Sequence, residues 1–466
     1  MIYAIVLSVV IATLCIVTAV KTMSVHTRGD FLVAGRKLPW GVLVFTLLSS
    51  WIGAGSLFAG AENAYRNGFA ALWQPAGGWL GLIVIAMIAG RARRFAQFTV
   101  PDLLEARYNA TARVLATIAI VISYTVITSY QFKGGGDVLH LIFPQMDTTV
   151  GMYIVAAFVI VFTASAGMAS IAYLDLIIGV LVTVIVIIAV PLLLGNGGWS
   201  QVRATLPASH FTPLGDIGLK KALAYLLPTL LLLVGNQGMY QKFFSAKSEK
   251  DARYAVFGWI VGTVTLETLL IALAVIGSAK FKTDRPREII ALVARQGLPS
   301  LVGAVLLGGI FAKVISTANN YLFSPATNLI HDVYGRFINP TASERRTLIV
   351  SRVLVVALGI FALLQATQFE SILNASLYAY TVYGAAVTPV VLAVFFWKRA
   401  TTAGAVTSIL LGTAATIAWN FAQSLGWKSD TDAVYPALIA SIVSLIAVSL
   451  MTAAPEPAKW KPFFET

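Results

Sequence analysis

Residues 39–62 read PWGVLVFTLLSSWIGAGSLFAGAE, and this run is long and apolar enough to cross a membrane. Its centre, residues 49–56, contains three serines and two glycines. Backbone at membrane depth must satisfy its own hydrogen bonds, so a break in a helix is tolerated only where it lines a cavity. The run therefore predicts a discontinuous transmembrane helix whose unwound carbonyls could bind a cation.

The composition of the whole chain agrees with a membrane protein. Hydrophobic residues make up 58% of the 466 residues and charged residues only 11%, which is too little polar surface for a soluble domain of this length. The same composition excludes a disordered chain. A disulfide-stabilised secreted domain is excluded as well, because Cys15 is the only cysteine.

Apolar stretches of spanning length recur along the chain and predict about thirteen transmembrane helices. They are residues 2–20, 39–62, 69–90, 112–132, 150–166, 171–195, 222–240, 254–278, 300–330, 347–366, 371–397, 402–424 and 433–453. With the N-terminus outside, the cytoplasmic loops carry 21 lysines and arginines, Lys242 among them, and the opposite loops carry 10. The positive-inside rule then predicts an N-out, C-in topology. The net charge of +13 is read as this topology signal, and no nucleic-acid partner is expected.

A second stretch, residues 222–241, also combines an apolar span with residues that interrupt helices. Pro228-Thr229 lies at its middle and Gly235-Asn236-Gln237-Gly238 near its end. A proline removes one backbone hydrogen bond and clashes with the preceding turn. The two interrupted spans lie near the starts of two five-helix blocks, a pattern typical of inverted-repeat transporters. We therefore expect an all-α membrane protein with a 5+5 inverted-repeat core, in which core helices 1 and 6 are broken.

This architecture divides the chain into five parts. We expect an extra N-terminal helix and a cytoplasmic loop in 1–38, the first five-helix repeat in 39–195, an extracellular loop in 196–221, the second repeat in 222–397, and two additional C-terminal helices with a short tail in 398–466.

Three ionisable residues fall inside predicted spans, where such residues are costly and mark functional sites by default. Asp175 lies near the cytoplasmic end of its span, so it either reaches the interface or is buried. Glu267 lies near the middle of its span. Lys313 precedes Ser316 and Thr317 by three and four residues, so the three side chains share one helix face. Alternatively, the two hydroxyls bond to their own helix carbonyls.

Several stretches together carry a resemblance to a known family. They are FLVAGRKLPW (31–40), SSWIGAGSLFAGAENAYRNG (49–68), TVPDLLEARYN (99–109), SAGMASIAYLDLIIG (165–179), NQGMYQKFFSAKSEKDAR (236–253) and AKVISTANNYLFSPATNLIHDVY (312–334). In this order and spacing the chain resembles the sodium:solute symporter family. The family is built on the inverted-repeat fold shared with bacterial leucine transporters.

The resemblance implies a sodium site between core helices 1 and 8, with sodium as the coupling ion and no other cofactor. The matching ligands are the backbone carbonyls of Ser49, Ile52 and Lys313 and the hydroxyls of Ser316 and Thr317. Five oxygens suit a hard cation. Asp175 matches an aspartate on the sodium exit path of the family.

Lys313 departs from the family pattern, which has a small residue at this position. Two unit charges about 4 Å apart repel by about 4 kcal/mol at an effective dielectric near 20, so its ammonium would compete with sodium. Three interpretations stay open. Lys313 either points away or pairs with Glu267, and the sodium site is intact, or it replaces sodium and titrates, so that the carrier is proton-coupled or uncoupled. In the third, Lys313 is deprotonated and has no effect on the site.

The solute is expected near the bilayer midplane, between core helices 1, 2, 3, 6 and 8. The candidate lining residues are Trp51, Ser56, Trp73, Gln74, Gln131 and Thr229. The residue patterns of the family's sugar and proline carriers are not met, so the resemblance leaves the solute open.

These observations predict a secondary active transporter of the cell membrane that imports a small solute by symport with sodium through alternating access. The alternative is a proton-coupled or uncoupled carrier in which Lys313 takes the place of sodium. A non-transporting solute sensor is a remote alternative, because we expect no signalling domain after the last span. An enzyme is not expected: the four histidines are scattered, and a nucleotide-binding glycine loop is missing from the sequence. The expected partners are the solute, sodium and the lipid bilayer.

Overall fold

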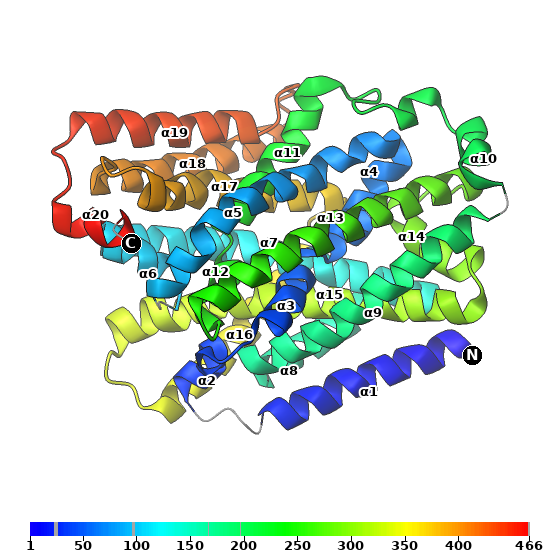
Figure 1. Cartoon of the computed structure of the whole chain (residues 1–466), viewed down its shortest axis with the longest axis horizontal. Helices are drawn as coiled ribbons and strands as arrows, with labels where there is room; N and C mark the ends of the chain where they lie inside the picture. Colours follow the sequence, from blue (N-terminus) through cyan, green and yellow to red (C-terminus); the bar gives the residue numbers. More distant parts are fainter. Residues whose placement is uncertain (23–26, 96–97, 166, 196, 465–466) are drawn as a thin grey trace.

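The computed structural model describes residues 1–22, 27–95, 98–165, 167–195 and 197–464. In this part of the chain twelve helices are long and apolar enough to cross a membrane, and they run roughly along one direction in a single bundle (Figure 1). The expectation of an all-α, multi-pass membrane protein is confirmed.

The long helices are α1 (Ile2–Thr22), α5 (Trp73–Phe95), α7 (Ala110–Ile142), α8 (Thr148–Ser165), α9 (Met168–Leu194), α11 (Gly218–Gly235), α13 (Glu249–Lys280), α15 (Ser300–Asn328), α16 (Glu344–Ala366), α17 (Ile372–Phe396), α18 (Thr402–Ser424) and α19 (Val434–Met451). The shorter helices are α2 (Arg28–Val33), α3 (Trp40–Trp51), α4 (Gly60–Asn67), α6 (Val100–Arg107), α10 (Gly198–Thr205), α12 (Gln237–Ser245), α14 (Ile289–Leu292) and α20 (Pro457–Phe464).

The predicted span 39–62 is present as a broken helix. Helix α3 ends at Trp51, and the backbone of Ile52 is extended, with φ −87° and ψ 103°. The chain then re-enters a helical path through the π-turn η2 (Gly55–Ala59) and α4. Gly68, with φ +60°, ends α4 before the chain continues toward α5, a conformation that favours glycine. By length and composition the described residues contain twelve candidate spans, where about thirteen were expected. The second part of the broken span is continuous with α5 over Gly55–Phe95, and its first part, Trp40–Trp51, is too short to count alone.

The second break lies at Asn236 and not at Pro228. Helix α11 continues through Pro228 to Gly235, whereas Asn236 has a non-helical ψ of 109°. The Asn236 side chain accepts a hydrogen bond from the Met239 amide at 3.2 Å and so caps the N-terminus of α12. The helix is therefore broken at the capped residue Asn236 and continues through Pro228.

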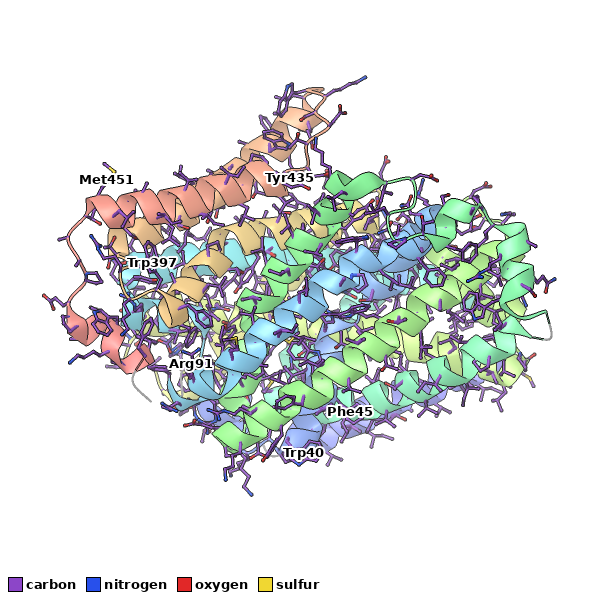
Figure 2. The ribbon with its side chains drawn as sticks, turned by 45° about the horizontal axis from the view of Figure 1, so that its top comes forward. Trp40, Phe45, Arg91, Trp397, Tyr435 and Met451 are labelled. Carbon is purple, nitrogen blue, oxygen red and sulfur yellow. The ribbon has the colours of Figure 1, made fainter. Side chains whose placement is uncertain are left out.

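Burial places α15 and α17 at the centre of the bundle and α1 at its edge. In their most apolar windows, 89% of the α17 residues and 83% of the residues in the α15 span are buried, but only 17% of the α1 residues. Helix α1 lies on one side of the bundle, and α18 and α19 lie on the other (Figure 1). Large apolar side chains such as Trp40 and Met451 lie on the outer surface (Figure 2). A surface of this kind suits contact with lipid.

Close packing of α5 against α11 depends on Gly77. A Cβ atom at Gly77 would lie 2.0 Å from the carbonyl oxygen of Leu226. We expect Gly77→Ala to destabilise the protein by about 1–3 kcal/mol, because overpacking forces the helices apart. Thermal unfolding of the detergent-purified protein measures the effect. Gly41→Ala is the control, since its Cβ would meet no atom within 4 Å. Equal melting temperatures for both variants would contradict the packing described here.

Candidate functional site

The end of α3 meets α15 at a cluster of oxygen atoms. Because α3 ends at Trp51, the carbonyls of its last residues are free to bind other groups. The Thr317 hydroxyl donates a hydrogen bond to the carbonyl oxygen of Ser49 at 3.0 Å and also lies 3.3 Å from that of Ile52. All three residues are buried. A Cβ at Gly53 would lie 2.5 Å from the Thr317 side chain, so this glycine permits the contact.

Lys313 points its ammonium group into this region. Its Nζ donates a hydrogen bond to the Ser49 hydroxyl at 2.9 Å, and the side chain is fully buried on α15. The suggested pairing of Lys313 with Glu267 is wrong, because the Glu267 carboxylate accepts hydrogen bonds from other residues at a different place. An oxygen cluster suited to sodium therefore lies next to a lysine of this chain.

Asp175, on α9, is fully buried inside the protein. Its carboxylate accepts hydrogen bonds from Thr46 at 2.5 Å, from Asn320 at 3.2 Å, and from the Ser316 hydroxyl. In this state Ser316 therefore faces Asp175 and not the carbonyls of α3. Three helices, α3, α9 and α15, meet at this one carboxylate.

Lys242 is a member of this network that the sequence analysis missed. Its assignment to the charges of the cytoplasmic loops is wrong, because the side chain is fully buried on α12. Its Nζ donates to the Ser50 hydroxyl at 2.5 Å and to the Asn320 side-chain oxygen at 2.7 Å. The sequence feature that could have indicated the burial of Lys242 is the break at Gly235-Asn236-Gln237-Gly238, because α12 follows it directly and remains inside the bundle.

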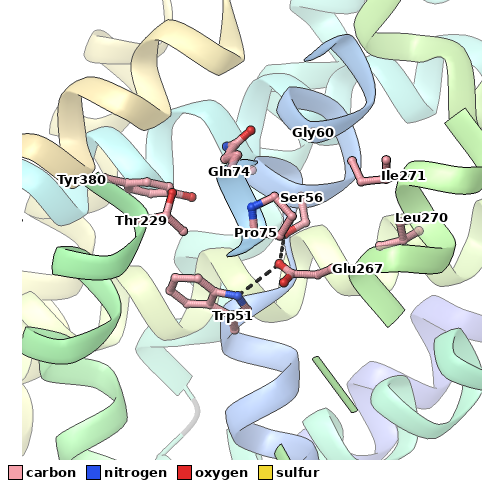
Figure 3. A pocket seen from close by; sticks show the side chains of 11 residues that line it. Trp51, Ser56, Gly60, Gln74, Pro75, Thr229, Glu267, Leu270, Ile271 and Tyr380 are labelled. Carbon is pink, nitrogen blue, oxygen red and sulfur yellow. Dashed lines mark hydrogen bonds between the residues drawn. The ribbon is translucent and has the colours of Figure 1, made fainter. Parts of the chain in front are cut away.

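A separate pocket opens beside the break, on the side of α5, α11, α13 and α17. Its cavity volume is about 20 Å³, enough for about one water molecule. It is lined by Trp51, Gly55, Ser56, Gly60, Gln74, Pro75, Thr229, Glu267, Leu270, Ile271 and Tyr380 (Figure 3). Four of the six candidate solute residues, Trp51, Ser56, Gln74 and Thr229, are therefore brought together.

The other two candidates lie elsewhere. The Trp73 indole donates a hydrogen bond to the carbonyl oxygen of Pro213 at 2.8 Å and faces a cavity formed with residues 211–213. Gln131 is buried on α7, where its side-chain oxygen accepts a hydrogen bond from the Ala54 amide at 2.8 Å. Gln131 thus satisfies the unwound backbone of the break.

Glu267, on α13, is the acidic residue of this pocket. Its Oε1 accepts hydrogen bonds from the Trp51 indole and from the Ser56 hydroxyl, each at 3.1 Å (Figure 3). Its Oε2 accepts one from the Trp79 indole at 2.8 Å. Because Trp51 and Ser56 lie on either side of the break, one carboxylate contacts both arms of the broken helix.

A second group of ionisable residues lies where α6, α7 and the helical turn Leu329–Ile338 meet. Asp102, His331 and Asp332 are close enough for a metal ion. The Arg113 guanidinium, however, donates hydrogen bonds to Asp102, Glu105 and Asp332. A buried guanidinium among these carboxylates makes this an ion-pair cluster.

Comparison with known proteins relates these features to one family. The model of the sodium:solute symporter family matches residues 31–412. The osmoregulated proline transporter OpuE of Bacillus subtilis is 24% identical, covering 93% of this chain and 92% of that protein. The high-affinity proline transporter PutP of the same species is 26% identical, covering 92% and 94%. The solved structure of a Na⁺-coupled sialic acid symporter in its outward-open state has a TM-score of 0.84 at 17% identity and covers 98% of this chain and 99% of that one. The structural likeness shows a shared fold.

Asp175 and Lys242 are connected through Asn320, so their contributions to stability are expected to depend on each other. We expect Asp175→Asn to destabilise the protein more in the native background than in Lys242→Met, because it leaves a buried ammonium without its nearby anion. The coupling should be about 0.5–3 kcal/mol. A double-mutant cycle of unfolding in detergent measures it. Strictly additive effects would contradict the connection.

Proposed function

Because this chain belongs to the sodium:solute symporter family, we propose that it imports a small solute across the cell membrane by symport with sodium, through alternating access. The observation that carries the proposal is the meeting of the Ser49 and Ile52 carbonyls with the Thr317 hydroxyl at the break of α3. Oxygen ligands of this kind suit a hard monovalent cation as they suit hard divalent ones.

The proposed sodium ligands are the carbonyls of Ser49, Ile52 and Lys313 and the hydroxyls of Ser316 and Thr317. Ser316 completes the set only after its hydroxyl turns away from Asp175. Sodium binding would then connect α3 to α15 and release a hydrogen bond on the Asp175 carboxylate. Asp175 is thereby placed to receive the ion on its way to the inside.

The ammonium group of Lys313 opposes sodium binding at the proposed site. Its ammonium occupies a hydrogen bond to Ser49 beside the proposed site. At about 4 Å two unit charges repel by about 4 kcal/mol with an effective dielectric near 20. Sodium therefore binds when Lys313 withdraws from Ser49 or gives up its proton. The alternative, a carrier in which Lys313 takes the place of sodium, is supported by the same contact between Lys313 and Ser49. Membership of the sodium:solute symporter family favours sodium as the coupling ion.

Solute binds, in this proposal, in the pocket between Trp51, Gln74, Thr229 and Glu267. In this state the cavity volume is only about 20 Å³, far below the range of small-molecule sites, so the lining helices must move apart before the solute enters. The two named relatives from Bacillus subtilis are proline transporters. Trp51 adjoins Ile52, so the solute pocket and the sodium site share the unwound segment of α3.

The topology and repeat boundaries are part of the same proposal. Residues 39–195 and 222–397 form the two five-helix repeats, with 1–38, 196–221 and 398–466 outside them, and a four-helix bundle rocks against the scaffold. The N-terminus lies outside and the C-terminus inside, as the loop charges favour.

Replacing Ser316 and Thr317 together by alanine should weaken the sodium dependence of the protein. We expect the sodium concentration for half-maximal thermal stabilisation in detergent to rise by about tenfold or more, because two hydroxyl ligands are lost and a bound ion stabilises only the native state. Potassium or choline at equal ionic strength is the salt control, and Ser351→Ala on α16 is the matched variant. Unchanged sodium stabilisation in the double variant would rule out this site.

Lys313→Met removes the competing charge and should have the opposite effect. We expect its half-maximal sodium concentration to fall by at least about tenfold, in line with the Coulomb repulsion given above. Sodium titrations of the melting temperature and of solute uptake in liposomes measure it. If the native protein shows no response to sodium and the variant gains one, the lysine substitutes for the ion. An unchanged sodium concentration would mean that Lys313 does not act on the site.

A further inference from the structure

The buried carboxylate of Glu267 is held by neutral groups. Its three donors are two indole N–H groups and one hydroxyl, from Trp51, Trp79 and Ser56. Within the described residues no lysine, arginine or histidine forms an ion pair with Glu267, although other buried acids such as Asp137 and Asp332 do have an arginine partner. Burying a carboxylate without a counter-charge is costly, so burial by itself favours the protonated acid, and a cation from outside the chain would stabilise the charged form.

The pocket also contains hydrogen-bond acceptors that a ligand with N–H groups could use. A carboxylate has about four lone-pair positions, and Glu267 uses three of them, two on Oε1 and one on Oε2. The side-chain oxygen of Gln74 is also buried, with no hydrogen-bond partner among the described residues. Gln74 and Glu267 both line the pocket (Figure 3). Two open acceptors in one small space suit a ligand with several N–H donors.

The rest of the lining favours a cation over an anion. None of the eleven lining residues is basic. The aromatic side chains of Trp51 and Tyr380 also face this space, and aromatic rings attract ammonium groups through their π faces. A solute that carried only a carboxylate would meet the charge of Glu267 with nothing to offset the repulsion.

We propose that the transported solute carries a protonated amine, whose N–H groups bind the Glu267 carboxylate and the Gln74 side-chain oxygen. This inference deepens the proposed symport and rests on it, because it names the chemical class of the solute that enters the pocket. Glu267 acts as the specificity-determining residue, and Trp51 and Ser56 hold its carboxylate in place.

Matched pairs of small molecules test the charge requirement. The probes are putrescine with 1,4-butanediol and tyramine with tyrosol, in which each alcohol replaces an amine of similar size. Thermal unfolding of the full-length protein in detergent is followed in two series: the probe is titrated at fixed sodium chloride, and sodium is titrated without probe at fixed ionic strength. The variants are Glu267→Gln, Glu267→Asp, and Glu249→Gln as the control, since Glu249 pairs with Arg94 on the surface.

At least one amine should raise the melting temperature of the native protein and of Glu249→Gln, while its alcohol partner should not. Glu267→Gln should bind that amine about 30-fold more weakly or worse and keep the sodium response. Glu267→Asp, which keeps the charge, should recover part of the affinity and shows that the variants fold.

Three results would overturn the inference: alcohols that bind as well as their amines, no amine-selective binding by the native protein, or amine binding that survives in Glu267→Gln. A sodium response that is lost in Glu267→Gln would instead assign the carboxylate to a metal ion and would also overturn it. Loss of the sodium response in the native protein is a different outcome, because it contradicts the symport and not the charge of the solute.

Discussion

The arrangement of the helices around the candidate site depends on the buried carboxylate of Asp175. It accepts hydrogen bonds from Thr46 on α3 and from Ser316 and Asn320 on α15. Asn320 in turn accepts a hydrogen bond from Lys242 on α12. A charge in this position is costly unless it is fully hydrogen-bonded, so the helices that supply its partners must stay together in this state. The carboxylate therefore links the break of α3 to the helix that carries Ser316 and Thr317.

Features that follow from local chemistry could be predicted from the sequence. Glycine and serine in the middle of an apolar span predict a break at 49–56, since few other structures satisfy such a backbone in lipid. The spacing of Lys313, Ser316 and Thr317 predicts one shared helix face. Whether the second helix breaks at Pro228 or at Asn236 was harder to predict. Neighbouring helices can accommodate a proline within a continuous helix, whereas the cap at Asn236 depends on the geometry of its side chain.

Features that depend on contacts between distant segments could not be predicted in this way. Lys242 looks like a loop charge because it follows a span and precedes other charges, and only the fold places it against Ser50 and Asn320. Trp73 looks like a pocket residue but faces another cavity. Glu267 was visible as an ionisable residue in a span, yet its position between Trp51 and Ser56 depends on how α13 packs beside the break.

The unwound segment has one more consequence, which concerns energy transduction. The Ile52 carbonyl belongs to the oxygen cluster, and the neighbouring Trp51 indole is bound by Glu267. Two ligands that order the same short piece of backbone each reduce the entropy that the other must still lose. Their affinities are then linked reciprocally, so each raises the binding constant of the other by the same factor. Coupled binding of this kind, together with alternating access, would let a gradient of one ligand drive the transport of the other.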